Sequence, residues 1–460
     1  MSIKQYGEMK ENGNNIPKVS VVVPCLNVER YIADCLESIV GQTLRELEIL
    51  VIDAGSSDGT QDILDAYVRK DERVQVIKSI KKSYGYQVNL GIRKAAGQYI
   101  AIVDADDKIA YNMYEVLYDN ACCSDADYVK WTARCFYTVS EDYIYEMPLA
   151  QFPQKEYREG KIELVPMERS DLLTKDNFLW YGIFRRELMK EVIFHESSGA
   201  AFQDFGGLLQ TQMKAGKAVY LEDAFYGYRQ DNDASSFRNT KGFQFVWEEY
   251  SWAEQFIVNA SDEWKCAFYK KMFLHTLSIY YKMAADGIVW DNCGEYIKLI
   301  REKVSGQLDL KTIGRENFSD DEWEDLRLLL ESPSGLYHKY REQYQRGIRQ
   351  IMEISKVAAD GDIVIFGCGI MGQFVYAQLR KHGWGSVAAF CDNRMEKQGL
   401  IYDDVTVLSP LKAAELYPKA YFVITSIAGY QDMERQLRAM EIPFGHICAY
   451  TAGPDMYLFG

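Results

Sequence analysis

An alternation of short β-rich runs with amphipathic stretches near the start of the chain constrains its fold more than any other feature. Apolar runs rich in β-branched residues lie at 19–23, 48–53, 74–77 and 99–103, and stretches with helical apolar spacing separate them. Strands that alternate with helices of this length predict an α/β fold with a doubly wound, mainly parallel sheet. Ligands bind such sheets beyond the carboxyl ends of the strands, so these ends are the first place to search for chemistry.

Two polar residues are expected to begin the helices that follow the first two strands. Asn27 precedes apolar side chains at helical spacing, which is typical of an N-cap. Asp58 is expected to cap the next helix, and Gln61, three residues later, fits the reciprocal partner of a capping box.

The end of the fourth predicted strand carries the strongest chemical signal, an acidic run from Asp104 to Asp107. Asp104 and Asp106 stand at i and i+2, so both carboxylates can reach one divalent cation where the chain turns. Hard cations such as Mg²⁺ and Mn²⁺ prefer oxygen ligands and commonly bridge to a substrate diphosphate. An isolated Asp-x-Asp is more often a solvated acidic turn, so the motif gains its weight from the sequence around it.

Three segments supply this context, at residues 19–27, 50–60 and 89–107. Their motifs follow the order and spacing of family 2 glycosyltransferases of the GT-A fold, which the chain resembles. The resemblance is specific over roughly residues 18–120 and weaker to about residue 240. It implies a GT-A catalytic domain that takes a nucleotide-diphosphate sugar as its donor.

The resemblance also implies roles for residues at the strand ends. Pro24 and Asp53 would line the nucleotide base pocket, where the Asp53 carboxylate would accept a hydrogen bond from uracil or another base edge. Asp104 would hold the ribose or assist the metal, and Asp106 would bind Mg²⁺ or Mn²⁺ on the diphosphate. Arg229, in a later loop, would reach the diphosphate.

A later Gln203-Asp204 pair is similar to the Glu-Asp pair in which the family carries its catalytic base, and this makes Asp204 the implied base. An inverting transferase needs one base to take the acceptor proton while the acceptor oxygen attacks the anomeric carbon. A single carboxylate fits this reaction better than the paired carboxylates of retaining glycosidases. The alternative for Asp204 is a helix N-cap.

The sequence departs from the family pattern at three positions. Ala54 stands where a second Asp is frequent, so one nucleotide contact is missing or is supplied by Ser56. Val88 stands where many members have an Arg, and Gln203 replaces the Glu of the Glu-Asp pair. These departures leave the donor sugar and its nucleotide unnamed.

An aromatic cluster precedes the implied base. Trp180 or Tyr181 could stack on the acceptor sugar, as the resemblance suggests, and packing in the core is the alternative for either ring. His195 also lies close in sequence to Asp204, and a lone His of this kind is more often a structural hydrogen-bonding residue.

A second βαβ pattern begins at the predicted strand 362–366 and contains a glycine motif. Gly367, Gly369 and Gly372 precede a helix, and Asp392 ends the next predicted strand. This is the context of a dinucleotide fingerprint, in which glycines approach the phosphates and an acid binds ribose. Use of the turn for packing, or for a regulatory nucleotide, is an alternative of at least equal weight. Further strands are expected at 387–391 and 421–425.

A chain of 460 residues is too long for one compact core, so several domains are expected. The predicted parts are a flexible tail at 1–17, a GT-A domain at 18–240, a helical connector at 241–349 and a Rossmann-like domain at 350–460.

The composition limits which partners and which cellular location are expected. A net charge of −15 argues against nucleic acid as a partner, because phosphate contacts need a basic surface. Ten cysteines without a CxxC pair suggest a reducing cytoplasm. No apolar run reaches the roughly 18 residues of a membrane helix, so the expectation is a soluble protein. Peripheral association with the inner face of the membrane and homodimerisation are both compatible with this pattern.

Together these features predict an inverting, metal-dependent glycosyltransferase of hexosyltransferase type. It would move a sugar, with UDP the expected nucleotide, to a hydroxyl of a glycan or glycolipid in bacterial-type surface polysaccharide assembly. One alternative is a non-catalytic sugar-nucleotide sensor or scaffold. Another is a nucleotidyltransferase, which would need a Gly-rich basic loop that residues 19–27 do not have.

Overall fold

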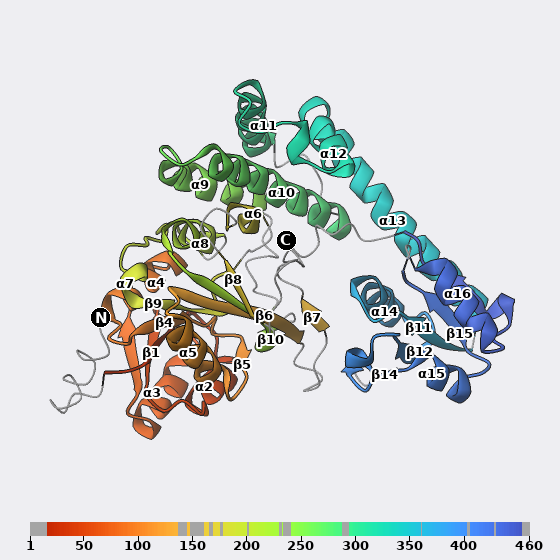
Figure 1. The fold of residues 1–460 in the computed structure, drawn as a ribbon, viewed down its shortest axis with the longest axis horizontal. Helices are drawn as coiled ribbons and strands as arrows, with labels where there is room; N and C mark the ends of the chain where they lie inside the picture. Colours follow the sequence, from red (N-terminus) through yellow and green to blue (C-terminus); the bar gives the residue numbers. More distant parts are fainter. Residues whose placement is uncertain are drawn as a thin grey trace. The chain divides into compact units, whose positions relative to one another are not determined.

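The computed structural model describes residues 16–136, 145–147, 161–164, 169–174, 178–199, 202–229, 232, 241–287, 294–359, 361–402, 405–426 and 429–452. Chain contacts divide the protein into two units, whose main boundary falls between Met272 and Phe273. Each unit contains its own β-sheet, and the α/β class predicted from the sequence is confirmed (Figure 1).

The sheet of the first unit has a parallel half built from the four predicted strands. Its spatial order is β3-β2-β1-β4, and all three pairings are parallel. The strands are β1 (Val19–Cys25), β2 (Leu47–Asp53), β3 (Val74–Lys78) and β4 (Tyr99–Ile102). Their carboxyl ends therefore meet at one edge of the sheet, as the sequence predicts.

Beyond β4 the sheet becomes antiparallel, so the prediction of a mainly parallel sheet is correct only for its first half. β9 (Gly182–Arg185) pairs antiparallel with both β4 and β6 (Tyr128–Phe136). β10 (Ala218–Arg229) follows in the order and pairs antiparallel with β5 (Lys108–Ile109). β8 (Lys161–Leu164) also pairs with β10, and β7 (Tyr145–Met147) pairs with β6.

Helices cover this sheet because the strands of its parallel half are apolar on both faces. Val88 and Ile92 of one helix and Leu208 of another pack with Val22 and Leu50 in a single core cluster. All seven residues of β1 are buried, as expected for a central parallel strand. The helices of this unit include α2 (Ile32–Val40), α3 (Thr60–Lys70), α4 (Tyr84–Lys94), α5 (Met113–Ser124), α6 (Arg169–Leu173), α7 (Arg186–Met189) and α8 (Gln203–Lys214).

Both helix starts predicted from polar residues need correction. Tyr31 is the N-cap of α2, whereas Asn27 has a positive φ of 54° and accepts a hydrogen bond from the Ser57 backbone N–H at 2.8 Å. Gly59 is the N-cap of α3, although Asp58 still accepts from the Thr60 N–H at 3.1 Å. Asn27 therefore contacts the neighbouring loop and does not cap α2, and the N-cap of α3 lies one residue later than predicted.

Helices follow the first sheet, as the sequence pattern from residue 241 predicts. They are α9 (Gly242–Ala253), α10 (Asp262–Asp286), α11 (Gly294–Asp309), α12 (Asp320–Glu331) and α13 (Pro333–Ala358). The boundary between the two units falls inside α10, so α9 belongs to the first unit. Phe205 of α8 stacks on Tyr250 of α9, with ring centroids 4.1 Å apart.

The second sheet has the order β13-β14-β12-β11-β15-β16, and only the β13 pairing is antiparallel. The predicted strands at 362–366, 387–391 and 421–425 correspond to β11 (Asp362–Phe366), β12 (Ser386–Cys391) and β15 (Tyr421–Ile424). The other elements are α14 (Ile370–His382), β13 (Ile401–Tyr402), β14 (Val405–Leu408), α15 (Pro410–Leu416), α16 (Tyr430–Ala439) and β16 (Ile447–Ala449).

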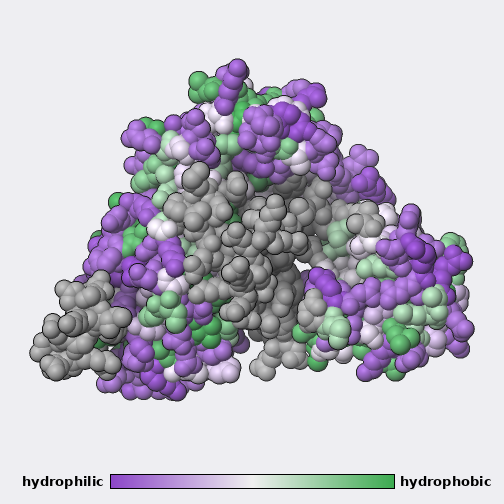
Figure 2. Space-filling view, viewed as in Figure 1, coloured by the Kyte–Doolittle hydropathy of each residue, from purple (hydrophilic) through white to green (hydrophobic). Residues whose placement is uncertain are grey.

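The face of the molecule drawn in Figure 2 carries mainly hydrophilic residues among those described, with hydrophobic residues scattered among them. Among the described helices, none combines the length and the apolar character that crossing a bilayer requires.

Candidate functional site

The acidic run after β4 forms a turn that is held by a tyrosine from β10. The Asp107 N–H donates to the Asp104 carbonyl oxygen at 3.0 Å and closes the turn. The Tyr226 hydroxyl donates to Asp107 Oδ2 at 2.7 Å and accepts from the Asp104 N–H at 3.1 Å. Asp107 is only 1% exposed. It supports the turn, and Asp104 and Asp106 are left as the partly exposed carboxylates.

Arg229 reaches this turn and hydrogen-bonds it through both its backbone and its side chain. Its backbone N–H donates to Asp107 Oδ1 at 2.8 Å, and its Nε donates to the Asp106 carbonyl oxygen at 2.6 Å. The guanidinium lies 4.8 Å from the ring centroid of Tyr31. Asn232 donates to Asp106 Oδ2 at 2.7 Å. The predicted contact of Arg229 with a diphosphate stays a prediction, and its role in this structure is to hold the acidic turn.

One oxygen of the Asp104 carboxyl group is available to bind a ligand. The Oδ1 atom is buried and has no hydrogen-bond partner in the described part of the chain, while the Tyr84 side chain hydrogen-bonds the carboxyl group. Burial, together with the negative charges of Asp106 and Asp204, raises its pKa to about 8. A nearby cation would relieve both effects.

This donor set fits a divalent cation that is completed by a ligand. Within the described ranges, no group of three His, Cys, Asp or Glu side chains is arranged to hold a metal ion. Mg²⁺ is usually bound through one or two carboxylates together with substrate phosphates. Asp104 and Asp106 supply two such carboxylates, and the unpartnered Oδ1 atom of Asp104 favours cation binding at this position.

The ends of β1 and β2 lie side by side, since Pro24 pairs with Ile52 and Cys25 pairs with Asp53. The Asp53 carboxylate accepts from the Ser56 N–H at 3.1 Å and from the Ser56 hydroxyl at 2.6 Å. Ser56 also accepts from the Asn27 N–H at 2.8 Å. Asp53 and Ser56 thus order their own loop, and their contact with a nucleotide base stays a prediction.

Asp204 lies in the first turn of α8, and Phe202 is the N-cap residue, so the N-cap alternative for Asp204 is wrong. Burial raises the pKa of Asp204 to about 7. The Glu249 charge contributes to this rise, whereas the positive charge of Lys130 opposes it. A carboxylate with a pKa near neutrality suits a general base.

The structure brings the implied base and the acidic turn into one electrostatic environment. The charge of Asp204 raises the pKa of Asp104, and both carboxylates also raise the pKa of the Tyr84 hydroxyl. The two acids come from distant parts of the sequence, and the fold places them at the same edge of the sheet.

The aromatic cluster is buried. Trp180 is 3% exposed and Tyr181 is 2% exposed. The Trp180 ring lies 4.4 Å from that of Tyr226 and 5.0 Å from that of Tyr228, centroid to centroid. The Lys130 ammonium lies 4.3 Å from the Tyr181 centroid. This burial favours core packing over the predicted stacking of Trp180 or Tyr181 on an acceptor sugar.

The glycines of the motif in the second sheet allow the close backbone packing of the turn in which they lie. A Cβ on Gly372 would lie 1.9 Å from the Gly367 carbonyl oxygen, and Gly367 has a φ of +104°. Asp392 accepts from the Cys368 N–H at 3.1 Å. Burial raises the pKa of Asp392, but hydrogen bonds from Arg394 and Cys368 outweigh this effect and lower the pKa to about 2. These contacts favour the packing alternative for Gly367, Gly372 and Asp392.

Gly369 differs from the other two glycines of the motif. It is the N-cap of α14, and a Cβ there would meet no described atom within 4 Å. Dinucleotide binding at this turn stays a prediction.

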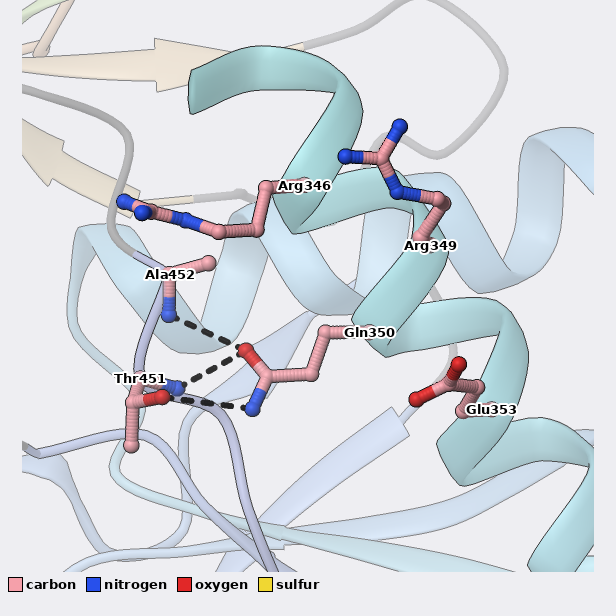
Figure 3. Close-up of a pocket in the computed structure, with 6 residues that line it drawn as sticks. All are labelled: Arg346, Arg349, Gln350, Glu353, Thr451 and Ala452. Carbon is pink, nitrogen blue, oxygen red and sulfur yellow. Dashed lines mark hydrogen bonds between the residues drawn. The ribbon is translucent and has the colours of Figure 1, made fainter. Parts of the chain in front are cut away.

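A cavity of about 570 Å³ lies in the second unit (Figure 3). Its floor is fixed by Gln350, whose Oε1 accepts from the backbone N–H groups of Thr451 and Ala452 at 3.1 and 3.0 Å. No residue of the predicted sites lines it. Its lining consists of Arg346, Arg349, Gln350, Glu353, Thr451 and Ala452.

Sequence reasoning missed several residues of the site. Tyr226 and Asp107 lie within or beside motifs that the sequence makes visible, so their support of the turn could have been suspected. Lys130 and Glu249 are single residues in segments without a motif, and only the three-dimensional structure brings their charges close to Asp204.

Comparisons with known proteins agree with the sequence pattern. Residues 20–192 match the family model described as Glycosyl transferase family 2. Glycosyltransferase GlyG of Streptococcus pneumoniae serotype 4 is 32% identical over 223 residues, which cover 46% of this chain and 70% of that protein. EpsJ of Bacillus subtilis (strain 168), described as an uncharacterized glycosyltransferase, is 31% identical over 222 residues, with coverages of 47% and 62%. The chain thus spans less than two thirds of the length of EpsJ.

A solved structure shares the fold. The crystal structure of S. aureus TarS residues 1–349 in complex with UDP-GlcNAc aligns with a TM-score of 0.50 and 20% identity. The alignment covers 72% of this chain and 92% of that chain. At this level of identity, the similarity concerns the architecture.

Proposed function

The chain belongs to glycosyl transferase family 2, and from this premise we propose that its first unit is an inverting, metal-dependent glycosyltransferase. The donor is a nucleotide-diphosphate sugar, with UDP as the nucleotide. The observation that carries the proposal is the proximity of Asp104 and Asp204. The charge of Asp204 raises the pKa of Asp104, and burial raises the pKa of both carboxyl groups.

The donor is proposed to lie across the carboxyl ends of β1, β2 and β4. Pro24 and Asp53 would border the base, and Asp104 and Asp106 would hold a Mg²⁺ or Mn²⁺ ion against the diphosphate. When bound, the cation neutralises charge on the diphosphate as the bond to the sugar breaks. TarS, the structural neighbour solved with UDP-GlcNAc, supports the choice of UDP for the first test.

Asp204 is proposed as the general base. It would take the proton of the acceptor hydroxyl while that oxygen forms a bond to the anomeric carbon. The bond from this carbon to the diphosphate oxygen breaks with its electron pair, and the nucleoside diphosphate leaves. Attack from the face opposite to the leaving group inverts the anomeric configuration.

The acceptor is proposed to be a hydroxyl of a glycan or glycolipid in surface polysaccharide assembly. Action in the cytoplasm at the inner face of the membrane, and homodimerisation, stay predictions. So does a dinucleotide at the glycine motif of the second unit.

The proposal is tested by thermal-shift and calorimetric titration of the whole chain with UDP, UDP-glucose, UDP-galactose and UDP-N-acetylglucosamine, each with Mn²⁺ or with EDTA. We expect binding that depends on Mn²⁺ and is lost in Asp106→Asn. Glu415→Gln, which changes an exposed acid of α15, serves as the matched control and should bind like the wild type. Tight binding without metal would refute the assigned cation site, and the absence of any nucleotide binding would refute the proposed activity.

A further inference from the structure

We propose that Glu249 is a positioning residue for Asp204, which it holds in place through a hydrogen-bond relay that runs over Ser197 and Gln203. This inference rests on the proposed function of Asp204 as the base. It adds a residue from α9 to a site otherwise built from the acidic turn after β4 and the first turns of α4 and α8.

The relay has a consistent direction from donor to acceptor. The Gln203 Nε2 group donates to the Ser197 hydroxyl at 2.6 Å and to the Ser197 carbonyl oxygen at 2.9 Å. The Ser197 hydroxyl in turn donates to Glu249 Oε1 at 2.6 Å. Gln203 directly precedes Asp204 on α8, so fixing the Gln203 side chain fixes the turn that carries the base.

The other end of Gln203 ties the same turn to α4. Its Oε1 accepts from the Gly85 N–H at 2.6 Å. The preceding residue, Tyr84, is hydrogen-bonded through its side chain to the Asp104 carboxyl group. One buried amide therefore connects the turn of the proposed base with the turn that holds the proposed cation ligand.

The segment that carries Ser197 is fastened along α4. Asn89 donates to the Phe194 carbonyl oxygen and accepts from the Phe194 N–H, both at 2.9 Å. The Tyr84 N–H donates to the Gly199 carbonyl oxygen at 2.9 Å. Ser197 therefore lies on a fixed strap, residues 194–199, between α4 and α9, and Glu249 holds this strap from the α9 side.

The relay explains why an amide fits position 203, where the family pattern has Glu. A carboxylate at 203 could accept from Gly85 but could not donate to the Ser197 carbonyl oxygen or hydroxyl. It would also place a third acid beside Glu249 and Asp204. Gln203 and the buried acid at 249, which is 1% exposed, therefore complement each other.

Other groups around Glu249 are compatible with this role. His195 Nδ1 lies 3.0 Å from Oε1, and the His195 ring stacks on Trp252 with an interplanar angle of 9°. Burial, helped by the charge of Glu248 and opposed by the Ser197 hydrogen bond, raises the pKa of Glu249 to about 8. Glu249 Oε2 is buried without a hydrogen-bond partner among the described residues.

The test uses variants that remove or preserve the acceptor of the Ser197 hydrogen bond. Glu249→Ala removes it, Glu249→Gln keeps an oxygen in its place, and Ser197→Ala deletes the hydroxyl at minimal cost in volume. Glu415→Gln, at an exposed acid of α15, is the control. UDP release from the three UDP sugars, with water or an added glycan as acceptor, gives kcat and the KM for the donor, and Mn²⁺-dependent UDP binding is measured in parallel.

We expect Glu249→Ala and Ser197→Ala to lower kcat by at least about tenfold, because small displacements of a catalytic group are costly, while the donor KM stays within about twofold. Glu249→Gln should recover most of the lost kcat, and Glu415→Gln should match the wild type. An unchanged kcat in both Glu249→Ala and Ser197→Ala would overturn the proposal, as would a loss expressed only in KM.

Asp204→Asn, measured alongside, separates the two proposals. If Asp204→Asn loses turnover while the Glu249 and Ser197 variants keep it, the relay is refuted and the proposed base is retained. If Asp204→Asn keeps wild-type turnover, the proposed base itself is refuted, and the relay fails with it.

Discussion

At the scale of single residues, the site depends on carboxyl groups whose pKa values are raised by burial. Asp204 has a pKa of about 7 and must be ionised to accept a proton, so turnover should rise with pH through about 7. The positive charge of Lys130 lowers this pKa, because a nearby cation favours the ionised form.

Lys130→Met tests this balance of charges. Loss of the positive charge should raise the pKa of Asp204, so the acidic limb of the kcat–pH profile should move to higher pH. Lys412→Met, which changes an exposed lysine of α15, is the control and should leave the profile unchanged. A profile of Lys130→Met that coincides with the wild type would contradict the assigned electrostatics.

Glu249 makes a prediction about stability as a function of pH. Its folded-state pKa of about 8 is raised above the roughly 4.3 of an unfolded chain, so the folded state binds this proton more tightly. The stabilising contribution is complete below about pH 4 and is lost as the pH rises through about 8. The Tm of Glu249→Gln should therefore fall less than that of the wild type between pH 6 and pH 9. Equal slopes would show that Glu249 does not titrate as described.

Other residues show where local sequence patterns stop being informative. Asn27 has the composition of an N-cap, but its side chain is used by Ser57 in a different loop. The family resemblance implies nucleotide contacts for Asp53 and Ser56, but in the structure their side chains hydrogen-bond each other. Short polar residues have several local partners available, and the one that is chosen depends on contacts that are distant in sequence.

At the scale of elements, the parallel strands were predictable because burial on both faces leaves a continuous apolar run. The predicted runs and the observed bounds of β1 to β4 nearly coincide. The antiparallel half was not predictable, since β9 and β5 are short strands of four and two residues without clear periodicity. The contribution of α9 was also hidden, because nothing in its sequence indicates that Glu249 reaches Ser197.

The close approach of α4 to the strap at residues 194–199 gives a prediction about packing. A Cβ on Gly85 would lie 1.9 Å from the His195 carbonyl oxygen, which is backbone and cannot move aside alone. Gly85→Ala should therefore destabilise the protein by about 2 kcal/mol or more. Gly306→Ala, at an open position in α11, should be neutral or stabilising. Urea unfolding of both variants measures this difference, and equal free energies of unfolding would contradict the packing.

In the glycine motif of the second unit, a role in packing can be distinguished from a role in nucleotide binding by substituting one glycine at a time. Gly372→Ala should destabilise the protein, because its Cβ would meet the Gly367 carbonyl oxygen at 1.9 Å. Gly369→Ala should change the Tm little, because its Cβ meets no described atom within 4 Å. If Gly369→Ala removes a nucleotide-induced thermal shift that persists in Asp106→Asn, this turn binds a nucleotide. If no such shift exists in the wild type, the motif serves packing.

At the scale of the whole molecule, the chain combines a family 2 glycosyltransferase unit with a second α/β unit that has its own parallel sheet. The family match covers residues 20–192, which belong almost entirely to the first unit. The first unit gathers acids from β4 and α8, a tyrosine from β10 and a carboxylate from α9. Sequence motifs identified the acids of β4 and α8, and only folding revealed the residues that hold them.

The measurement that tests the central claim most directly is UDP release and Mn²⁺-dependent UDP binding by Asp204→Asn, compared with the wild type on the same UDP sugar. The asparagine keeps the shape of the side chain and removes the base. We predict that binding stays within about threefold, while turnover falls by at least about a hundredfold, as expected for the loss of a general base. Turnover equal to that of the wild type would contradict the account.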